Sequence, residues 1–259
     1  MLRNLRELYQ YRALLWSLTI RELKARYRAS VLGFLWTFLN PTLNMIVYAV
    51  VFGYLMKSAQ AAYPYFLFIA LLPWIFFATS VGTGASSVSD RRDLLTKVRF
   101  PAQVLPATVV ATNLLNYLLS LPLLIGLGIL YGHWPTWHVV FFFPLVLVQT
   151  VFILGLTYLV SAFNVALRDL QHIVLNVMQM LFFLTPVVWA ASSVPAKYRE
   201  LMNYGNPMAA LVNAYRSIFY DHTPPDPAPL AGVVCISMAL LWLSSGVFER
   251  RREEFAELV

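Results

Sequence analysis

The sequence predicts an all-α integral membrane protein with six transmembrane helices. Of its 259 residues, 59% are hydrophobic and only 12% are charged, whereas a soluble domain carries about 25% charged residues. Several separate apolar runs are long enough to span a bilayer, and the lysines and arginines gather at the ends of these runs. A soluble protein with a large core does not fit this pattern.

Residues 4–28 precede the first apolar run and predict an amphipathic interface helix. One face would carry Leu5, Tyr9, Trp16, Ile20, Leu23 and Tyr27, and a flank would carry Arg3, Arg6, Arg21, Lys24 and Arg28. Aromatic residues beside a cationic flank are typical of a helix that lies in the lipid headgroup plane. The alternative is a helix that packs on a soluble partner. The charges that continue to Arg28 exclude a cleavable signal peptide.

The six spans are expected at roughly 32–56, 64–87, 107–130, 138–164, 172–190 and 229–248. A helix from Leu32 to Met56 would reach roughly 37 Å, which exceeds the hydrocarbon thickness of about 30 Å. Pro122 and Pro186 interrupt the third and fifth spans. Proline is tolerated in a membrane helix where neighbouring groups satisfy the freed carbonyl.

The placement of basic residues predicts that both termini are cytoplasmic. With the N-terminus inside, the outer segments hold only four of the 19 basic residues, namely Lys57, Lys197, Arg199 and Arg216. This bias follows the positive-inside rule, so the net charge of +7 reflects orientation rather than nucleic-acid binding. No acidic residue falls within a span, which disfavours an ion-coupled transporter.

Two connections between spans predict structure of their own. In the inner loop, Ser89 or Asp90 can cap a short helix that runs to Lys97. The residues alone leave open whether this loop is merely solvated or docks a cytoplasmic partner. In the outer connection, a short helix after Pro195 would end at Gly205 as its C′ residue, and Asn206-Pro207 would cap a second short helix. This pair forms either a re-entrant hairpin or a cap on the surface.

The sequence shows no sign of catalysis. The four histidines, His133, His138, His172 and His222, lack metal-ligand spacing. There is no phosphate-cradling G-x-x-x-x-G-K-[ST] loop and no G-x-S-x-G motif. The chain is therefore expected neither to hydrolyse ATP alone nor to act as an enzyme.

Polar and aromatic residues recur at helical spacing within three spans. The first span carries Trp36, Asn40, Asn44 and Tyr48; the fifth carries His172, Asn176, Gln179 and Phe183; the third carries Asn113, Asn116 and Ser120. Amide groups are costly when they face hydrocarbon unpaired. These faces therefore either join helices to one another or line a water-filled path suited to a hydroxyl-rich solute.

Several short motifs, in order along nearly the whole chain, resemble the membrane subunits of polysaccharide-exporting ABC transporters, most of all the O-antigen (Wzm-type) permeases. They are Tyr27-Arg28-x-Ser30-x-Leu32-Gly33-x-x-Trp36 with Pro41, Arg99-Phe100-Pro101, Arg168-Asp169-Leu170, Leu184-Thr185-Pro186-Val187 and Asn206-Pro207. The resemblance implies a homodimer in the bacterial inner membrane that exports a polysaccharide linked to undecaprenyl. It also implies two copies of a separate ATPase subunit, which would bind ATP and Mg²⁺, and no cofactor in this chain.

The resemblance further implies roles for three sets of residues. Residues 89–100 would be a coupling helix that docks the ATPase through Asp90, Arg91, Arg92, Leu94, Leu95, Lys97 and Arg99. The substrate channel would be lined by Trp36, Asn40, Asn44, Tyr48, Asn176, Gln179 and Phe183. Residues 195–220 would form a periplasmic gate with Tyr198, Met202, Asn206, Pro207, Tyr215 and Phe219. No residue is expected to bind a metal.

Three alternatives to this function stay open. The same architecture serves ABC permeases for teichoic acid, capsule or a drug. A membrane enzyme acting on a polyprenyl-linked sugar would need inner-side carboxylates such as Asp90, Asp93 and Asp169. A scaffold would use the polar faces only for helix contacts.

Overall fold

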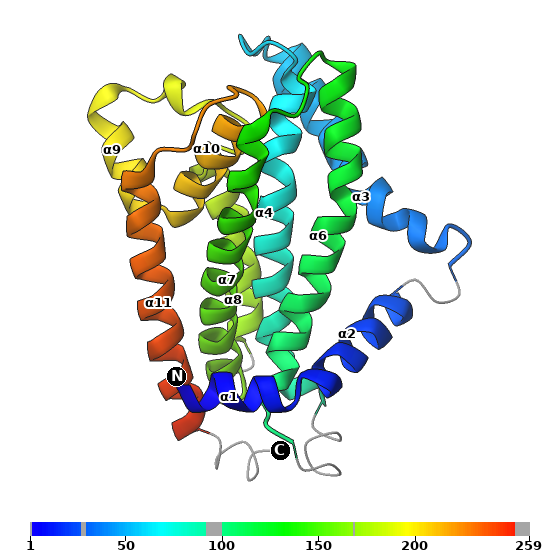
Figure 1. Cartoon of the computed structure of the whole chain (residues 1–259), viewed down its shortest axis with the longest axis vertical. Helices are drawn as coiled ribbons and strands as arrows, with labels where there is room; N and C mark the ends of the chain where they lie inside the picture. The colour runs from blue at the N-terminus through cyan, green and yellow to red at the C-terminus, as the bar shows by residue number, and fades with distance from the viewer. Residues whose placement is uncertain (1, 27–29, 92–99, 168, 252–259) are drawn as a thin grey trace.

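The computed structural model describes residues 2–26, 30–91, 100–167 and 169–251. Helices dominate this part of the chain: α1 Leu2–Gln10, α2 Arg12–Arg26, α3 Trp36–Tyr48, α4 Tyr63–Ala85, α6 Val104–Leu130, α7 Phe142–Asn164, α8 Leu170–Leu184, α9 Ala196–Gly205, α10 Pro207–Phe219 and α11 Pro227–Arg250. The long helices form an upright bundle (Figure 1). α1 and the last turn of α11 lie at one end of it, and α9 and α10 lie at the other.

Five helical stretches in the described residues are long and apolar enough to cross a membrane: Gly33–Leu55, Tyr63–Ala85, Val104–Leu130, Trp137–Asn164 and Pro227–Arg250. They match the first, second, third, fourth and sixth predicted spans within a few residues. The first consists of a 3-10 turn at Gly33–Leu35, α3, and a π-helix at Ala49–Leu55. Pro122 lies inside α6 without ending it.

α4 is the central helix of the bundle, and apolar residues lie on every side of it. Of its spanning window, 78% is buried, compared with 17% for the first stretch. It packs against α6, α7, α8 and α10, as expected for a helix that lacks a polar face. Gly84 permits its close approach to α7, because a Cβ atom there would overlap the methyl group of Thr157.

Up to Arg26, the predicted interface helix 4–28 is two helices, α1 and α2, that meet at Tyr11. Its last two residues, Tyr27 and Arg28, lie outside the described residues. The backbone hydrogen bonds from Tyr11 N to Glu7 O and from Leu15 N to Tyr11 O are both 2.9 Å long, so helical hydrogen bonding continues up to Tyr11 and beyond it. Tyr9 and Trp16 are exposed, which leaves these aromatic side chains available to a membrane surface.

In the fifth predicted span, 172–190, the helix ends earlier than expected because α8 stops at Leu184. Thr185 is extended, with ψ 139°, because a residue before proline is disfavoured in the helical region. Residues Thr185 to Val188 are nevertheless buried. Irregular backbone at such a place must find partners for its polar groups within the protein.

Arg216 of α10 provides those partners. The sequence grouped it with the outer charges, but only 4% of it is exposed. Its guanidinium donates to the carbonyls of Pro186, Val187 (2.8 Å) and Trp189 (3.2 Å). The same group lies 3.7 Å from the centre of the Phe66 ring, a geometry that attracts a cation. Arg216 therefore joins α10, α4 and the segment that follows α8.

The charge on Arg216 persists at neutral pH despite its burial. Burial lowers the pKa of Arg216 to about 9, an effect that Tyr63, Asp221 and Tyr220 oppose. Because this value lies above 7, the guanidinium keeps all its donors and its positive charge under ordinary conditions.

The two predicted short outer helices are confirmed as α9 and α10. Asn206 caps α10, since its side-chain oxygen accepts from the backbone N–H groups of Met208 and Ala209, and Pro207 begins the helix. The expected C′ role of Gly205 is wrong. Gly205 is the last residue of α9, and Asn206 follows it as the C-cap, extended with φ −122°. Asn206 leaves the helical conformation because its side chain caps the N-terminus of α10.

Replacing Gly84 tests the close contact between α4 and α7. We expect Gly84→Ala to lower the free energy of unfolding by about 1–3 kcal/mol, because the added methyl overpacks the interface. Thr157→Ser removes the opposing methyl and should restore most of that loss. Thermal unfolding in detergent measures both. Gly126→Ala is the matched control, since a Cβ there meets no atom within 4 Å. Equal stability of Gly84→Ala and wild type would contradict the contact.

Arg216→Leu should destabilise the protein severely, because each buried carbonyl left without a donor costs about 1–3 kcal/mol. Arg216→Lys should recover only part of the lost stability, since an ammonium group cannot reproduce the planar fork of guanidinium donors. Arg199→Leu is the control. Arg199 also donates to two carbonyls, of Ser192 and Val194, but it is exposed, so its loss should matter little. A fully stable Arg216→Lys protein would show that the fork is dispensable.

Candidate functional site

A cavity of about 760 Å³ lies between α3, α4 and α8. Four of the seven residues predicted to line a channel meet here: Asn44, Tyr48, Gln179 and Phe183. The opposite wall is α4, which contributes the Trp74 ring and the Thr79 and Thr83 side chains. Tyr48 is half-buried and packs on Phe182, with ring centres 5.1 Å apart. The first and fifth predicted spans therefore share one aromatic and polar cavity.

A second cavity, of about 370 Å³, adjoins the first and lies between α3, α4 and α6. It is lined by the predicted channel residues Trp36, Asn40 and Asn44 and by the polar residues of the third span, Asn113, Asn116 and Ser120. Asn44 borders both cavities. The Trp36 indole N–H donates to the Ser30 hydroxyl over 3.1 Å, and the Asn44 amide donates to the Asn40 carbonyl over 2.9 Å.

Asn176 is the one predicted channel residue that borders neither cavity. It is exposed, as are His172, Gln179 and Phe183. The helical spacing in the fifth span thus describes one face of α8 that is turned away from the packed core.

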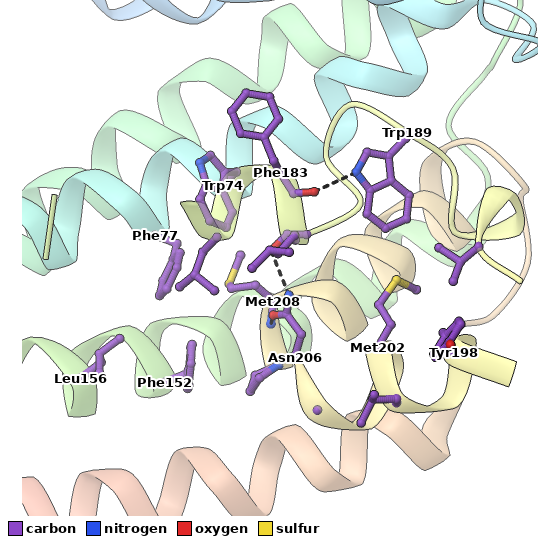
Figure 2. Close-up of a pocket in the computed structure, with 17 residues that line it drawn as sticks. Trp74, Phe77, Phe152, Leu156, Phe183, Trp189, Tyr198, Met202, Asn206 and Met208 are labelled. Atoms are coloured by element: carbon purple, nitrogen blue, oxygen red, sulfur yellow. Dashed lines mark hydrogen bonds between the residues drawn. The ribbon is translucent and has the colours of Figure 1, made fainter. Parts of the chain in front are cut away.

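A third cavity, of about 620 Å³, lies under the outer helices (Figure 2) and is largely apolar. The predicted gate residues Tyr198, Met202, Asn206 and Pro207 line it. So do Trp74 and Phe77 of α4 and Phe152 of α7. Phe183 borders this cavity as well as the 760 Å³ one. The aromatic lining is therefore shared between the middle of the bundle and its outer end.

Two hydrogen bonds shape the wall of the outer cavity, and Figure 2 shows both. The Asn206 amide donates to the Thr185 hydroxyl over 2.9 Å. The Trp189 indole N–H donates to the carbonyl of Phe183 over 3.1 Å. The first bond joins the start of α10 to the segment after α8, and the second joins that segment to the end of α8.

The remaining predicted gate residues, Tyr215 and Phe219, are buried in the core. The Tyr215 hydroxyl donates to the Gln149 side chain over 2.8 Å, and the Phe219 ring packs on Phe142 with centres 5.8 Å apart. They anchor α10 rather than border an opening. The resemblance that assigned all of these residues to a gate does not reveal which face of α10 a neighbouring helix covers.

The outer rim carries a cluster of ionisable groups. His133 and His222 approach through Nδ1 and Nε2 at 3.3 Å, and the His133 ring stacks on Tyr220 at 4.9 Å. Burial, followed by His133 and His138, lowers the pKa of His222, whereas Asp221 raises it. Burial raises the pKa of Asp221, which Arg216 opposes. His222 is therefore neutral at neutral pH.

Of the predicted docking residues, Asp90 and Arg91 are in the described part of the chain. Arg91 forms an ion pair with Glu22 of α2, with 2.7 Å between Nη2 and Oε2. A cavity of about 500 Å³ lies there, lined by Arg21, Arg26 and Asp90 among others. The other docking residues lie outside the described residues: Arg92, Leu94, Leu95, Lys97 and Arg99.

This arrangement suits the binding of a polar solute that also has apolar faces. Within the residues that the structure describes, no three His, Cys, Asp or Glu side chains gather as a metal site would require. The cavities instead offer aromatic faces, amides and hydroxyls. The sequence missed Arg216, Trp74 and Trp189. The proline after Thr185 was a signal that irregular backbone there would need donors, but nothing in the sequence pointed to Arg216.

Comparison with known proteins agrees with this description. Residues 13–220 match the family described as "ABC-2 type transporter". The chain is 58% identical over 260 residues, covering 100% of both chains, to the O-antigen export system permease protein RfbA of Myxococcus xanthus. It is 28% identical over 93% of both chains to an RfbA permease of Klebsiella pneumoniae. It is 21% identical over 92% of its own length and 93% of the relative's to the polysialic acid transport protein KpsM of Escherichia coli. The chain belongs to the ABC-2 type transporter family.

Proposed function

We propose that this chain is the channel-forming transmembrane subunit of an ATP-driven exporter. It moves an undecaprenyl-linked polysaccharide of the O-antigen class across the bacterial inner membrane. The 58% identity over the full length of an O-antigen export permease carries this proposal. The aromatic and amide lining of the cavities beside α3 supports it, because sugars offer hydroxyls for hydrogen bonds and apolar ring faces for stacking.

We further propose six membrane crossings with both termini in the cytoplasm. α8, at 15 residues, spans roughly 22 Å, so the buried segment after Leu184 would complete this crossing, the fifth along the chain. An even number of crossings agrees with Figure 1, where α1 and the end of α11 share one end of the bundle. The basic residues gather in the segments that this topology places inside.

The working unit is a homodimer with two copies of a separate ATPase subunit. Asn40, Asn44, Asn176 and Gln179 are exposed on α3 and α8, where amides facing lipid would be costly. A second copy facing these helices would enclose them in one central path. The ATPase docks at residues 89–100, and the Arg91–Glu22 ion pair transmits its movement to α2.

A capsule polysaccharide is the second candidate substrate. The likeness to the polysialic acid transport protein KpsM supports it. The identity to that protein is 21%, compared with 58% for the O-antigen permease, so the O-antigen class is favoured.

The double variant Trp36→Ala/Tyr48→Ala tests the path. Loss of two stacking faces should lower polysaccharide export by roughly tenfold, with the amount of protein in the membrane unchanged. The measurement is surface polysaccharide, with its lipid-linked precursor inside the cell, in a host that lacks this chain. Trp242→Ala is the control, since Trp242 is exposed on α11 and borders none of the four cavities described above.

Two results would count against the proposal in different ways. Failure of the wild-type chain, supplied with its ATPase subunit, to restore surface polysaccharide would refute the exporter function. Normal export by the double variant, next to a functional wild type, would leave the exporter function standing and remove these two rings from the path.

A further inference from the structure

Arg26, the last described residue of α2, connects two cavities at the inner end of the molecule. It lines the 500 Å³ cavity beside the Arg91–Glu22 ion pair and also the 370 Å³ cavity between α3, α4 and α6. Its Nη1 donates to Oδ1 of Asn113 over 3.2 Å. A positive charge therefore stands where a polar cavity at the surface meets a cavity within the bundle that is lined by both apolar and polar side chains.

The side-chain amide of Asn113 is a buried hydrogen-bond donor without an acceptor among the described residues. Only 3% of Asn113 is exposed, and the bond from Arg26 identifies which side-chain atom is the oxygen. Its amide nitrogen has no hydrogen-bond partner among the residues that the structure describes. A buried donor in this state costs about 1–3 kcal/mol, so the cavity is built to receive an acceptor.

The acceptor that fits is an anion. None of the described residues that line the 370 Å³ cavity is a carboxylate, and they include Arg26 and the amides of Asn40 and Asn113. A guanidinium presents its donors in a fork that matches two oxygens of a phosphate group, and such charge-assisted bonds are strong.

We propose that this cavity binds the diphosphate group of a polyprenyl-linked substrate as it enters from the cytoplasmic leaflet. This inference rests on the proposed exporter function and adds its recognition site. A lipid is favoured over a free anion because α3, which lines the cavity, also carries the exposed side chains Leu35, Leu43 and Val47. An apolar chain can lie along that face while its diphosphate reaches Arg26 and Asn113.

Asn113→Asp separates this role from a structural one. The aspartate keeps an oxygen for Arg26, so the contact between α2 and α6 survives as an ion pair. It also replaces the amide donor by a negative charge that repels diphosphate. If Asn113 only joins two helices, the variant should bind and export as wild type does. If the cavity binds diphosphate, the variant should fold and fail to bind.

The binding assay uses the full complex of this chain with its ATPase subunit, in phosphatidylcholine nanodiscs, with labelled farnesyl diphosphate as the probe. We expect Asn113→Asp and Arg26→Gln each to weaken binding by about tenfold or more. Asn213→Asp and Arg12→Gln are the matched controls. Asn213 bonds Asn203 in the outer helices, and Arg12 lies at the opposite end of α2 from Arg26, so both variants should bind the probe normally.

Competition identifies the source of the diphosphate. Unlabelled farnesyl diphosphate should displace the probe, whereas inorganic pyrophosphate or phosphatidylglycerol at the same concentration should not. Equal displacement by either would overturn the assignment to a lipid diphosphate. Wild-type affinity in Asn113→Asp, or no binding by the wild type, would overturn the site itself.

Export measured in parallel distinguishes this inference from the function on which it rests. If the wild type exports polysaccharide and Asn113→Asp binds and exports equally well, the site is wrong and the exporter function stands. If the wild type does not export, the exporter function is wrong whatever the binding result.

Discussion

The outer half of the molecule depends on a single constraint, which is that the carbonyls of residues 186–189 must find donors away from water. α8 ends at Leu184 because of Pro186, yet the chain stays buried after it. Arg216 donates hydrogen bonds to three of those carbonyls, and its guanidinium forms a cation–π contact with the Phe66 ring. The same contacts hold α10 inside the bundle, so α9 lies over the 620 Å³ cavity.

The bundle divides into a packed part and an open part, and the proposed path runs between them. α4 is buried along most of its length and packs on α3, α6, α7, α8 and α10, which makes it a fixed wall. The first spanning stretch is only 17% buried, and α8 exposes its polar face. α3 and α8 are therefore the helices that the proposed second copy would cover, and the ATPase would act on them through α2.

The sequence predicted the helices well and their surroundings poorly. Apolar length located the spans, and the capping chemistry of Asn206-Pro207 located α10, because both signals are local. α4 could not be recognised as central, because the spans at Trp137–Asn164 and Pro227–Arg250 are more apolar than it is. The residue type of Arg216 was known, but its burial depends on a segment some 30 positions away. Tyr215 and Phe219 were assigned to a gate for the same reason: which face is covered is a tertiary property. Asn44, Tyr48, Gln179 and Phe183 do share one cavity, so helical spacing was a sound guide there.

We propose that this chain works only together with a separate ATPase subunit, which supplies the energy for export. The decisive measurement is gentle purification of the chain from its native membrane, followed by determination of subunit composition and ATPase activity. We expect two copies of this chain with two copies of a nucleotide-binding subunit, and ATP hydrolysis by the complex. A pure chain without an ATPase, under conditions that preserve other membrane complexes, would contradict it and favour a membrane enzyme or a scaffold.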